Sequence, residues 1–255
     1  ANDWCVYAKG GSAHLRYEGN EIYDCGVGGF TAGQGTGFQY MTPPWIYYEA
    51  SDIKFVNNVI HDTGTAGLGV NGGYNILFAY NTLYRVGVGH RNNRADHVFE
   101  ANFGGQGCDD TEERSACASN LTAGGWGSTR VGQEVHIPNK NVYVYNNLFV
   151  NPTGTSAPYL LQIASPRTGP TGIGLDGMLV ADANLQFKGN VVADSSEDLG
   201  IGDSTGCAPS NSTCNPSQLR RDNQFVRSLN ASFSNVVAAD FRLSTSLSQQ
   251  PLPIP

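Results

Sequence analysis

The stretch IKFVNNVIHD at residues 53–62 contains two short apolar runs that meet at an asparagine, Asn58. Before Asn58, apolar residues occupy alternate positions, a pattern typical of a β-strand with one buried face. Ile60, two positions after the asparagine, begins a second strand that faces the same interior. Asparagine tolerates left-handed backbone conformations and bonds to nearby backbone groups, so it suits the bend between the two strands.

Four further segments repeat this pattern without gaps: LRYEGNEIYD at 15–24, ILFAYNTLYR at 76–85, VYVYNNLFVN at 142–151 and LQFKGNVVAD at 185–194. Their shared asparagines, with Asn58, are Asn20, Asn81, Asn147 and Asn190. Self-similar units of this length indicate stacked coils. The amides are therefore expected to lie above one another, each donating to the next in a ladder inside the turn.

A third strand is expected before each asparagine unit. The candidate segments alternate and are followed by turn residues: 28–33, 66–71, 97–104, 159–164 and 199–203. The alternative is an ordinary antiparallel sandwich with hairpins. Against it, the hairpin dipeptide Asn-Gly occurs only at 71–72, and aligned asparagines have no role in a sandwich.

On these asparagine units, over roughly residues 14–200, the chain resembles the right-handed parallel β-helix repeat proteins. These form a secreted group rich in polysaccharide lyases, glycoside hydrolases and epimerases. The resemblance implies an all-β fold, a single-stranded right-handed parallel β-helix with long loop insertions, as one domain over residues 1–250. DFRLS at 240–244 resembles the end of the last coil in such proteins, although Thr-Ser-Leu-Ser-Gln-Gln replaces the sequence that commonly follows it there.

At both ends of the chain, the sequence predicts further structure: additional coils before the first strand and a linker or stalk after the last coil. Residues 5–8 already have the pattern of a strand without a cap, so further coils are expected to precede them, in the native protein or on another chain. The Pro-rich residues 251–255 are expected to begin a linker or a wall-anchoring stalk.

Charge and cysteine content indicate an extracellular protein. The net charge of −7 disfavours a nucleic-acid partner, and no run of about 18 apolar residues could span a membrane. Proximity favours the disulfides Cys108–Cys117 and Cys207–Cys214, which leaves Cys5–Cys25, although other connectivities stay open. Glycosylation sequons occur at Asn120, Asn211 and Asn230. We expect a secreted, extracellular or cell-wall protein of the eukaryotic route; the alternative is a bacterial secreted protein with unmodified sequons.

In the families that the chain resembles, substrate lies along the outside of the strand that precedes the asparagine unit. The outward positions of 28–33 and 66–71 are rich in glycine, with Thr31 and Asn71 as the polar side chains that would contact substrate. In the long first loop, Trp45, Tyr47 and Tyr48 are expected to stack on sugar rings; packing onto the coil is the alternative.

The densest group of titratable residues lies between Tyr84 and Phe103. Its predicted catalytic residues are Arg85, His90, Arg91, Arg94, His97 and Glu100, with Asp96 beside them. Arginine could neutralise a substrate carboxylate and histidine could transfer a proton. The alternative is a solvated loop with internal ion pairs. The motifs of polygalacturonases, pectate lyases and chondroitinase-B-like lyases are not matched.

No cofactor is expected to be required, and no zinc-ligand spacing occurs. The acidic run at 109–113 is expected to be a solvated loop, with Ca²⁺ binding as the alternative. The sequence therefore predicts a secreted carbohydrate-active protein that binds or cleaves an extracellular polysaccharide by lyase or hydrolase chemistry. The alternative is a non-catalytic structural or adhesive module of a cell wall or extracellular surface assembly.

Overall fold

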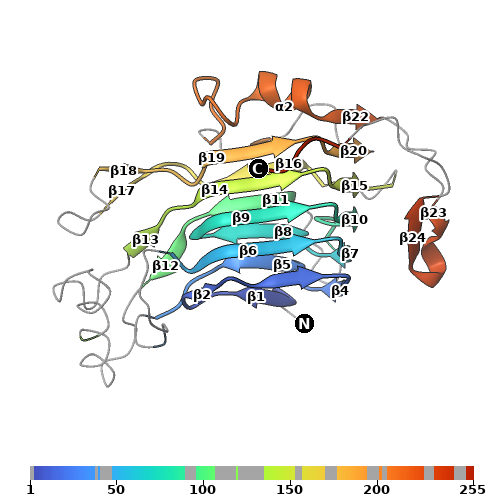
Figure 1. The fold of residues 1–255 in the computed structure, drawn as a ribbon, viewed down its shortest axis with the longest axis horizontal. Helices are drawn as coiled ribbons and strands as arrows, with labels where there is room; N and C mark the ends of the chain where they lie inside the picture. Colours follow the sequence, from blue (N-terminus) through green and yellow to red (C-terminus); the bar gives the residue numbers. More distant parts are fainter. Residues whose placement is uncertain are drawn as a thin grey trace.

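A computed structural model of the chain describes residues 3–37, 40, 48–89, 96–106, 119, 135–152, 157–169, 177–193, 201–202, 206–226, 233–243 and 251–255. Most of these residues lie in β-strands, and most strands belong to three parallel sheets (Figure 1).

Each of the three sheets is built from strands far apart in the sequence. Sheet 1 contains β1 (Val6–Ala8), β5 (Phe30–Gly33), β8 (Leu68–Asn71), β11 (His97–Asn102), β16 (Tyr159–Ile163) and β21 (Ile201–Gly202). Sheet 2 contains β2 (Ser12–Ala13), β3 (Arg16–Glu18), β6 (Ala50–Val56), β9 (Gly73–Ala79), β14 (Lys140–Tyr145) and β19 (Ala183–Lys188). Sheet 3 contains β4 (Glu21–Cys25), β7 (Val59–Thr63), β10 (Thr82–Tyr84), β15 (Leu148–Val150), β20 (Val191–Ala193) and β22 (Gln224–Val226).

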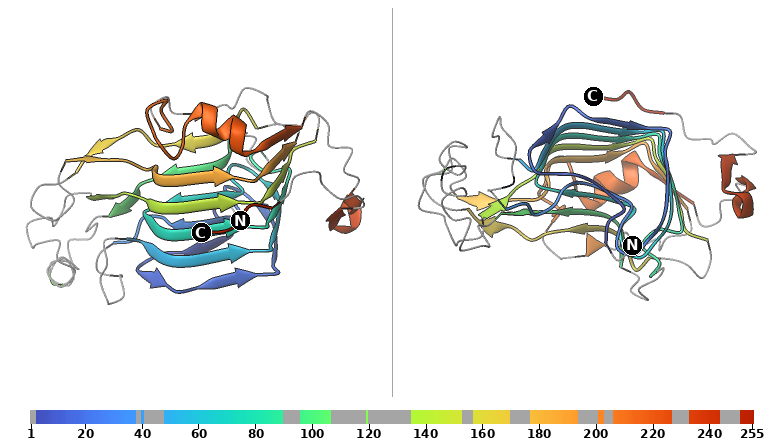
Figure 2. Two further views of the ribbon diagram at one scale, coloured as in Figure 1. Left: turned by 45° about the horizontal axis from the view of Figure 1, so that its top comes forward. Right: turned by 90° about the horizontal axis from the view of Figure 1, so that it is seen from below.

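The chain visits these sheets in a constant cyclic order, from sheet 1 to sheet 2 to sheet 3 and back to sheet 1, until a helix replaces the strand of sheet 2 before β22. Seen along the stack, successive turns of the chain lie over one another (Figure 2). This arrangement is compatible with a β-helix-like fold. The five asparagine units and the third strands before them are confirmed as strands, and the antiparallel sandwich is excluded because these sheets pair in parallel.

The interior is filled by aromatic and aliphatic side chains that repeat from rung to rung. Phe55, Phe78 and Phe187 occupy one register of sheet 2 and are almost completely buried. Phe30 of sheet 1 stacks on Phe55 with ring centroids 4.4 Å apart. Because neighbouring rungs present the same face inward, alternate apolar residues of every coil join one continuous core.

The predicted asparagine ladder is present. Within it, each Oδ1 accepts hydrogen bonds from the backbone N–H and the Nδ2 of the preceding asparagine; for Asn81 to Asn147 both distances are 2.9 Å. The same pair of bonds joins Asn20 to Asn58, Asn58 to Asn81 and Asn147 to Asn190. The ladder then continues to a sixth member, Asn223, which the sequence pattern did not reveal because a helix precedes it instead of a strand.

A second row of polar side chains runs along the edge where sheet 2 begins. Its members adopt positive φ angles between 53° and 58° at Asp52, Asn75, Asn141 and Asn184. Asn75 donates to Asp52, Asn141 to Asn75 and Asn184 to Asn141, at 2.9–3.1 Å. Asn and Asp adopt this left-handed conformation more readily than other side chains, which explains their recurrence at this corner.

Three C-terminal segments cover the stack. Helix α2 (Pro216–Asp222) begins at the N-cap Asn215 and lies across one end, where Leu219 is buried (Figures 1 and 2). The hairpin of β23 (Phe233–Asn235) and β24 (Asp240–Leu243) is antiparallel, so the prediction that residues 240–244 end the last coil is wrong; β22 forms the last rung of sheet 3 instead. Residues 251–255 lie on the outer face of sheet 2.

Two further hairpins project from the corner between sheets 1 and 2 (Figure 1). They are β12 (Gly104–Gln106) with β13 (Val135–Ile137), and β17 (Arg167–Thr168) with β18 (Met178–Leu179).

Candidate functional site

The outer face of sheet 1 presents one residue from each rung in strict alignment. Pairing in register aligns, in order, Tyr7, Thr31, Gly69, Glu100, Gln162 and Gly202. A neighbouring row contains Gly33, Asn71 and Asn102. Thr31 and Asn71, two of the residues predicted to contact substrate, therefore belong to this face.

Trp4 covers the glycine-rich part of this face. A Cβ atom on Gly28 or Gly69 would collide with the Trp4 ring, so these glycines are what allow the indole to lie flat against the sheet. Thr31, beside Gly69, is completely buried, and its hydroxyl donates to the carbonyl of Gly33. The open polar part of the face consequently begins at Glu100.

Glu100 is held by two side chains from neighbouring positions. Asn71 Nδ2 donates to Glu100 Oε1 at 2.8 Å, and His97 Nε2 lies 3.0 Å from Oε2. His97 is almost completely buried, and its Nδ1 lies 3.5 Å from an Asp96 oxygen. Nδ1 has no hydrogen-bond partner among the described residues. The sequence-predicted Asn71, His97 and Glu100 are thus brought together.

A small cavity of about 70 Å³ lies beside this carboxylate. Glu100, Asn102, Gln162 and Arg167 supply its polar walls. Arg167 is exposed, and its guanidinium lies 5.4 Å from the centre of the Phe103 ring. Sequence reasoning missed Asn102, Gln162 and Arg167, because each is an isolated polar residue whose proximity to Glu100 arises only from the stacking of rungs.

Glu49 is a second carboxyl group at the corner between sheets 1 and 2. Its Oε2 accepts hydrogen bonds from the Gly10 N–H at 2.9 Å and the Thr36 hydroxyl at 2.8 Å. Its Oε1 is buried and has no hydrogen-bond partner among the described residues. Burial raises the pKa of Glu49 to about 7, although these hydrogen bonds act to lower it. The sequence signal that could have revealed Glu49 is its position between Tyr48 and Ala50, directly before a buried strand.

Arg85 does not join this site. It lies at the end of β10 in sheet 3 and pairs with Asp62 at 3.2 Å. Asp62 also contacts His61, whose other ring nitrogen lies 3.2 Å from Glu21. The predicted catalytic residues His90, Arg91 and Arg94 lie outside the described residues.

Tyr48, the one described member of the predicted aromatic trio, stacks on Tyr74 with ring centroids 4.7 Å apart. Burial raises its pKa. Tyr48 itself therefore packs against a side chain of sheet 2. Trp45 and Tyr47 lie outside the described residues.

The disulfides Cys5–Cys25 and Cys207–Cys214 are confirmed. Cys108 and Cys117 lie outside the described residues, as do the sequon residues Asn120 and Asn230. Asn211 is described and lies inside the Cys207–Cys214 loop.

Among the described residues, no three His, Cys, Asp or Glu side chains come close enough together to hold a metal ion; the acidic run at 109–113 is outside them. No helix in the described ranges has the length and apolar character needed to cross a membrane.

The chain matches no protein-family model, no curated protein and no solved structure.

Proposed function

We propose that the chain is a secreted, carbohydrate-active right-handed parallel β-helix that binds or cleaves an extracellular polysaccharide on the outer face of sheet 1. The handedness is supported by chain physics, since connections between parallel strands of one sheet are right-handed in about 98% of cases. Secretion is supported by the two disulfides, which persist in oxidising compartments.

The observation that carries the function is the Glu100 carboxylate, fixed by Asn71 and His97 and lining one cavity with Arg167. A lyase on a uronic-acid polymer needs a cation to neutralise the sugar carboxylate and a base to remove the neighbouring proton. In this proposal Arg167 is the neutralising cation and Glu100 is the base, with His97 positioning it. The leaving sugar oxygen then takes its proton from solvent.

Hydrolysis is the second variant of this proposal. A glycosidase requires a protonated carboxylic acid together with an ionised carboxylate, and both must reach the substrate. Glu100 would supply the ionised carboxylate; Glu49 is completely buried and is not assigned the role of the acid.

A non-catalytic structural or adhesive module is the second candidate. It is favoured by Trp4, which covers the glycine-rich half of the same face and leaves a cavity of only about 70 Å³ beside Glu100. Such a module would bind a polymer or a neighbouring molecule without changing it.

The experiment incubates the protein with pectin, alginate, glycosaminoglycans and neutral glucans, and follows unsaturated products and reducing ends. Glu100→Gln, which retains the shape of the side chain, and Arg167→Ala are each expected to reduce the rate at least 100-fold. Glu18→Gln and Arg16→Ala are matched controls, because this exposed pair lies on sheet 2, and they should keep the full rate.

Unsaturated products would identify the protein as a lyase. New reducing ends without unsaturated products would identify it as a hydrolase. Binding without products would favour the adhesive module. If Glu100→Gln and Arg167→Ala both retain the full rate on an active substrate, the site assignment is wrong.

A further inference from the structure

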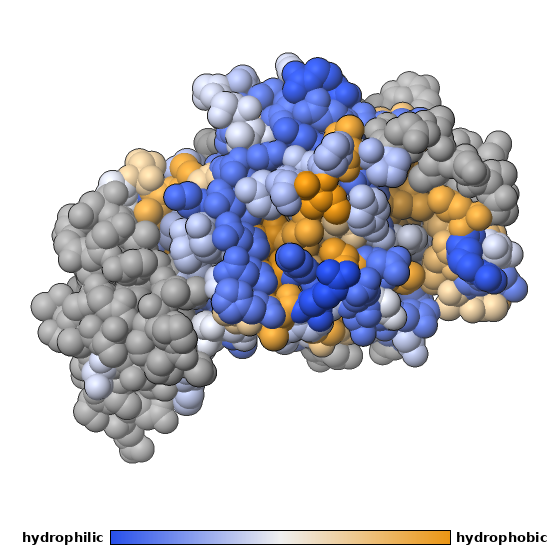
Figure 3. Space-filling model, in the orientation of Figure 1, coloured by the Kyte–Doolittle hydropathy of each residue, from blue (hydrophilic) through white to orange (hydrophobic). Residues whose placement is uncertain are grey.

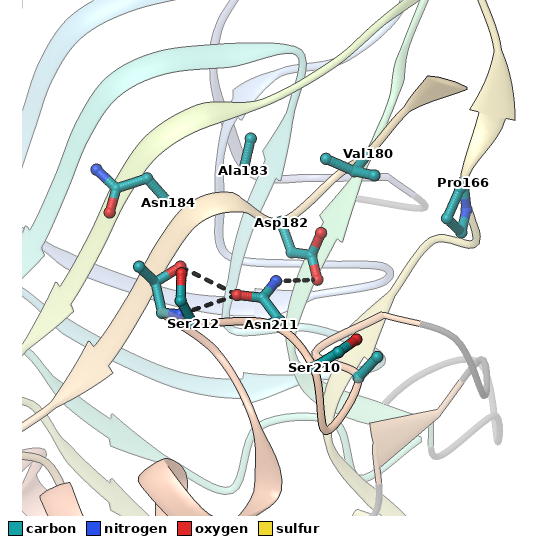
Figure 4. A pocket seen from close by; sticks show the side chains of 10 residues that line it. Pro166, Val180, Asp182, Ala183, Asn184, Ser210, Asn211 and Ser212 are labelled. Carbon is teal, nitrogen blue, oxygen red and sulfur yellow. Dashed lines mark hydrogen bonds between the residues drawn. The ribbon is translucent and has the colours of Figure 1, made fainter. Parts of the chain in front are cut away.

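A cavity of about 540 Å³ lies between the start of β19 and the Cys207–Cys214 loop (Figure 4). Its walls are formed by Pro166, Val180, Asp182, Ala183, Asn184, Ala208, Ser210, Asn211, Ser212 and Thr213. None of these residues belongs to the Glu100 site.

Asp182 supplies the one carboxylate of this wall and is held rigidly. Its Oδ2 accepts hydrogen bonds from the Cys207 N–H at 2.7 Å and from Asn211 Nδ2 at 2.9 Å. The residue is only 7% exposed. Within the described part of the chain, its Oδ1 receives no hydrogen bond, so that oxygen remains able to accept one from a ligand.

The adjoining wall, formed by the Cys207–Cys214 loop, is equally fixed. Asn211 Oδ1 accepts from the backbone N–H groups of Thr213 and Cys214 and from the Thr213 hydroxyl, at 2.9–3.2 Å. Asn215 donates to the Asn211 carbonyl, and the disulfide closes the loop. The cavity therefore needs little reorganisation to receive a ligand.

The lining determines which ligands fit. It contains a carboxylate and the hydroxyls of Ser210, Ser212 and Thr213, but no Lys, Arg or His side chain, so an anion would be repelled. Pro166, Val180 and Ala208 offer apolar surface for C–H groups. A ligand with several hydroxyls and apolar ring faces, without charge, matches this combination.

We propose that this cavity is a binding site for a neutral sugar, with Asp182 Oδ1 accepting a sugar hydroxyl. The sugar has two possible sources with the same chemistry. One is a free glycan. The other is the first sugar of a glycan attached to Asn211, whose sequon Asn211-Ser212-Thr213 forms part of the wall. A glycosylated amide keeps one N–H, which still donates to Asp182.

The first arm of the experiment uses protein from a host that does not glycosylate. N-acetylglucosamine, glucose, galactose and mannose are titrated while the amide NMR signals of Ser212 and Thr213 are followed. At least one sugar should give saturable shifts in the millimolar range, and glucuronate should give none. Ala208→Phe, which fills the cavity, should abolish the shifts. Ser212→Trp at its rim should abolish the shift of Thr213. Ser217→Phe on the exposed side of α2 is the matched control and should bind as before.

The second arm uses protein from a glycosylating secretory host, with occupancy of Asn211 measured by peptide mass spectrometry. If Asn211 is occupied and free sugars no longer shift Ser212 and Thr213, the attached sugar fills the cavity. If Asn211 is unoccupied and free sugars bind, the site serves a free glycan.

The proposal is overturned if no neutral sugar binds the bare protein and occupancy of Asn211 leaves the Ser212 signal and the melting temperature unchanged. It is equally overturned if glucosamine, a cation, binds and neutral sugars do not. Glu100→Gln should leave all these readouts unaltered, so failure here is distinguishable from failure of the proposed function.

Discussion

At the scale of single residues, asparagine is selected by its ability to donate and accept at once. Asn147 donates its backbone N–H and Nδ2 to Asn190, donates Nδ2 again to the Phe78 carbonyl, and accepts two bonds from Asn81. Aspartate lacks the donor, so it could not replace Asn147 in this buried position.

Replacing Asn147 by alanine should therefore destabilise the protein strongly. Two buried N–H groups of Asn81 and the Phe78 carbonyl would lose their partners, for a cost of about 3–5 kcal/mol in the free energy of unfolding. Urea denaturation measures this. Asn20→Ala is the matched control at the exposed end of the ladder, with an expected cost below about 1 kcal/mol. Equal losses in the two variants would show that the ladder does not stabilise the interior.

The raised pKa of Glu49 predicts that the stability of the folded protein depends on pH. Because its pKa is raised from 4.5 to about 7 in the folded state, its stabilising contribution is complete below pH 4.5, where both states are protonated. The contribution is lost as the pH rises to about 7, because the unfolded chain ionises first; the total change is roughly 3 kcal/mol.

Glu49→Gln cannot ionise, so its stability should change less between pH 4.5 and 7 than that of the native chain. Urea midpoints measured across this range test the prediction. Glu18→Gln, on an exposed side chain, is the control and should retain the native pH profile. Parallel profiles for Glu49→Gln and the native chain would refute it.

At the scale of elements, the outer faces of sheets 2 and 3 are covered by segments that follow the last coil. The β23–β24 hairpin places Phe233 and Phe241 against Tyr84 of sheet 3. Leu252 and Ile254 pack on Val56, Ala79 and Tyr145 of sheet 2, where an apolar strip interrupts the polar surface (Figure 3).

The side chain of Asn146 holds residues 251–255 through hydrogen bonds to the backbone of Leu252. Its Nδ2 donates to the Leu252 carbonyl and its Oδ1 accepts from the Leu252 N–H, both at 2.9 Å. Asn146→Gly removes this clamp without straining the positive φ of 57°. We expect it to cost about 1–2 kcal/mol of stability.

A double-mutant cycle tests the clamp. Removal of residues 251–255 should destabilise the native chain, but should cost much less in the Asn146→Gly background, because both changes release the same tail. Chemical denaturation gives the four stabilities. Strictly additive effects would mean that the two groups do not cooperate.

At the scale of the whole molecule, each rung contacts mainly its neighbours, so stability should vary along the stack. Hydrogen exchange should be slowest in β6, β9 and β14 of the central rungs. Leu219→Ala in the capping helix α2 should accelerate exchange in β19, β20 and β22 while leaving β6 unchanged, because Leu219 is buried at that end. Uniform acceleration, measured by mass spectrometry, would instead indicate one cooperative unit.

The sequence by itself determined most strands of the three parallel sheets, their cyclic order and the asparagine ladder, because these depend on short patterns that recur from coil to coil. It also indicated two described disulfides: Cys207–Cys214, because its cysteines are near one another in the chain, and Cys5–Cys25, as the pair that then remained. It did not reveal Asn223, whose rung begins with a helix, nor the antiparallel hairpin at 233–243.

The candidate site was decided only by the tertiary structure. Asn71 and Glu100 meet because their strands are adjacent rungs. Arg85 is closer to Glu100 in the sequence than Asn71 is, but it follows a strand of sheet 3 and pairs with Asp62 there. Burial of Glu49 and the bond between Asp182 and Asn211 likewise depend on segments far apart in the chain. A repeat specifies what every rung shares, but outward side chains and insertions differ from rung to rung, so their partners are determined only when the rungs stack.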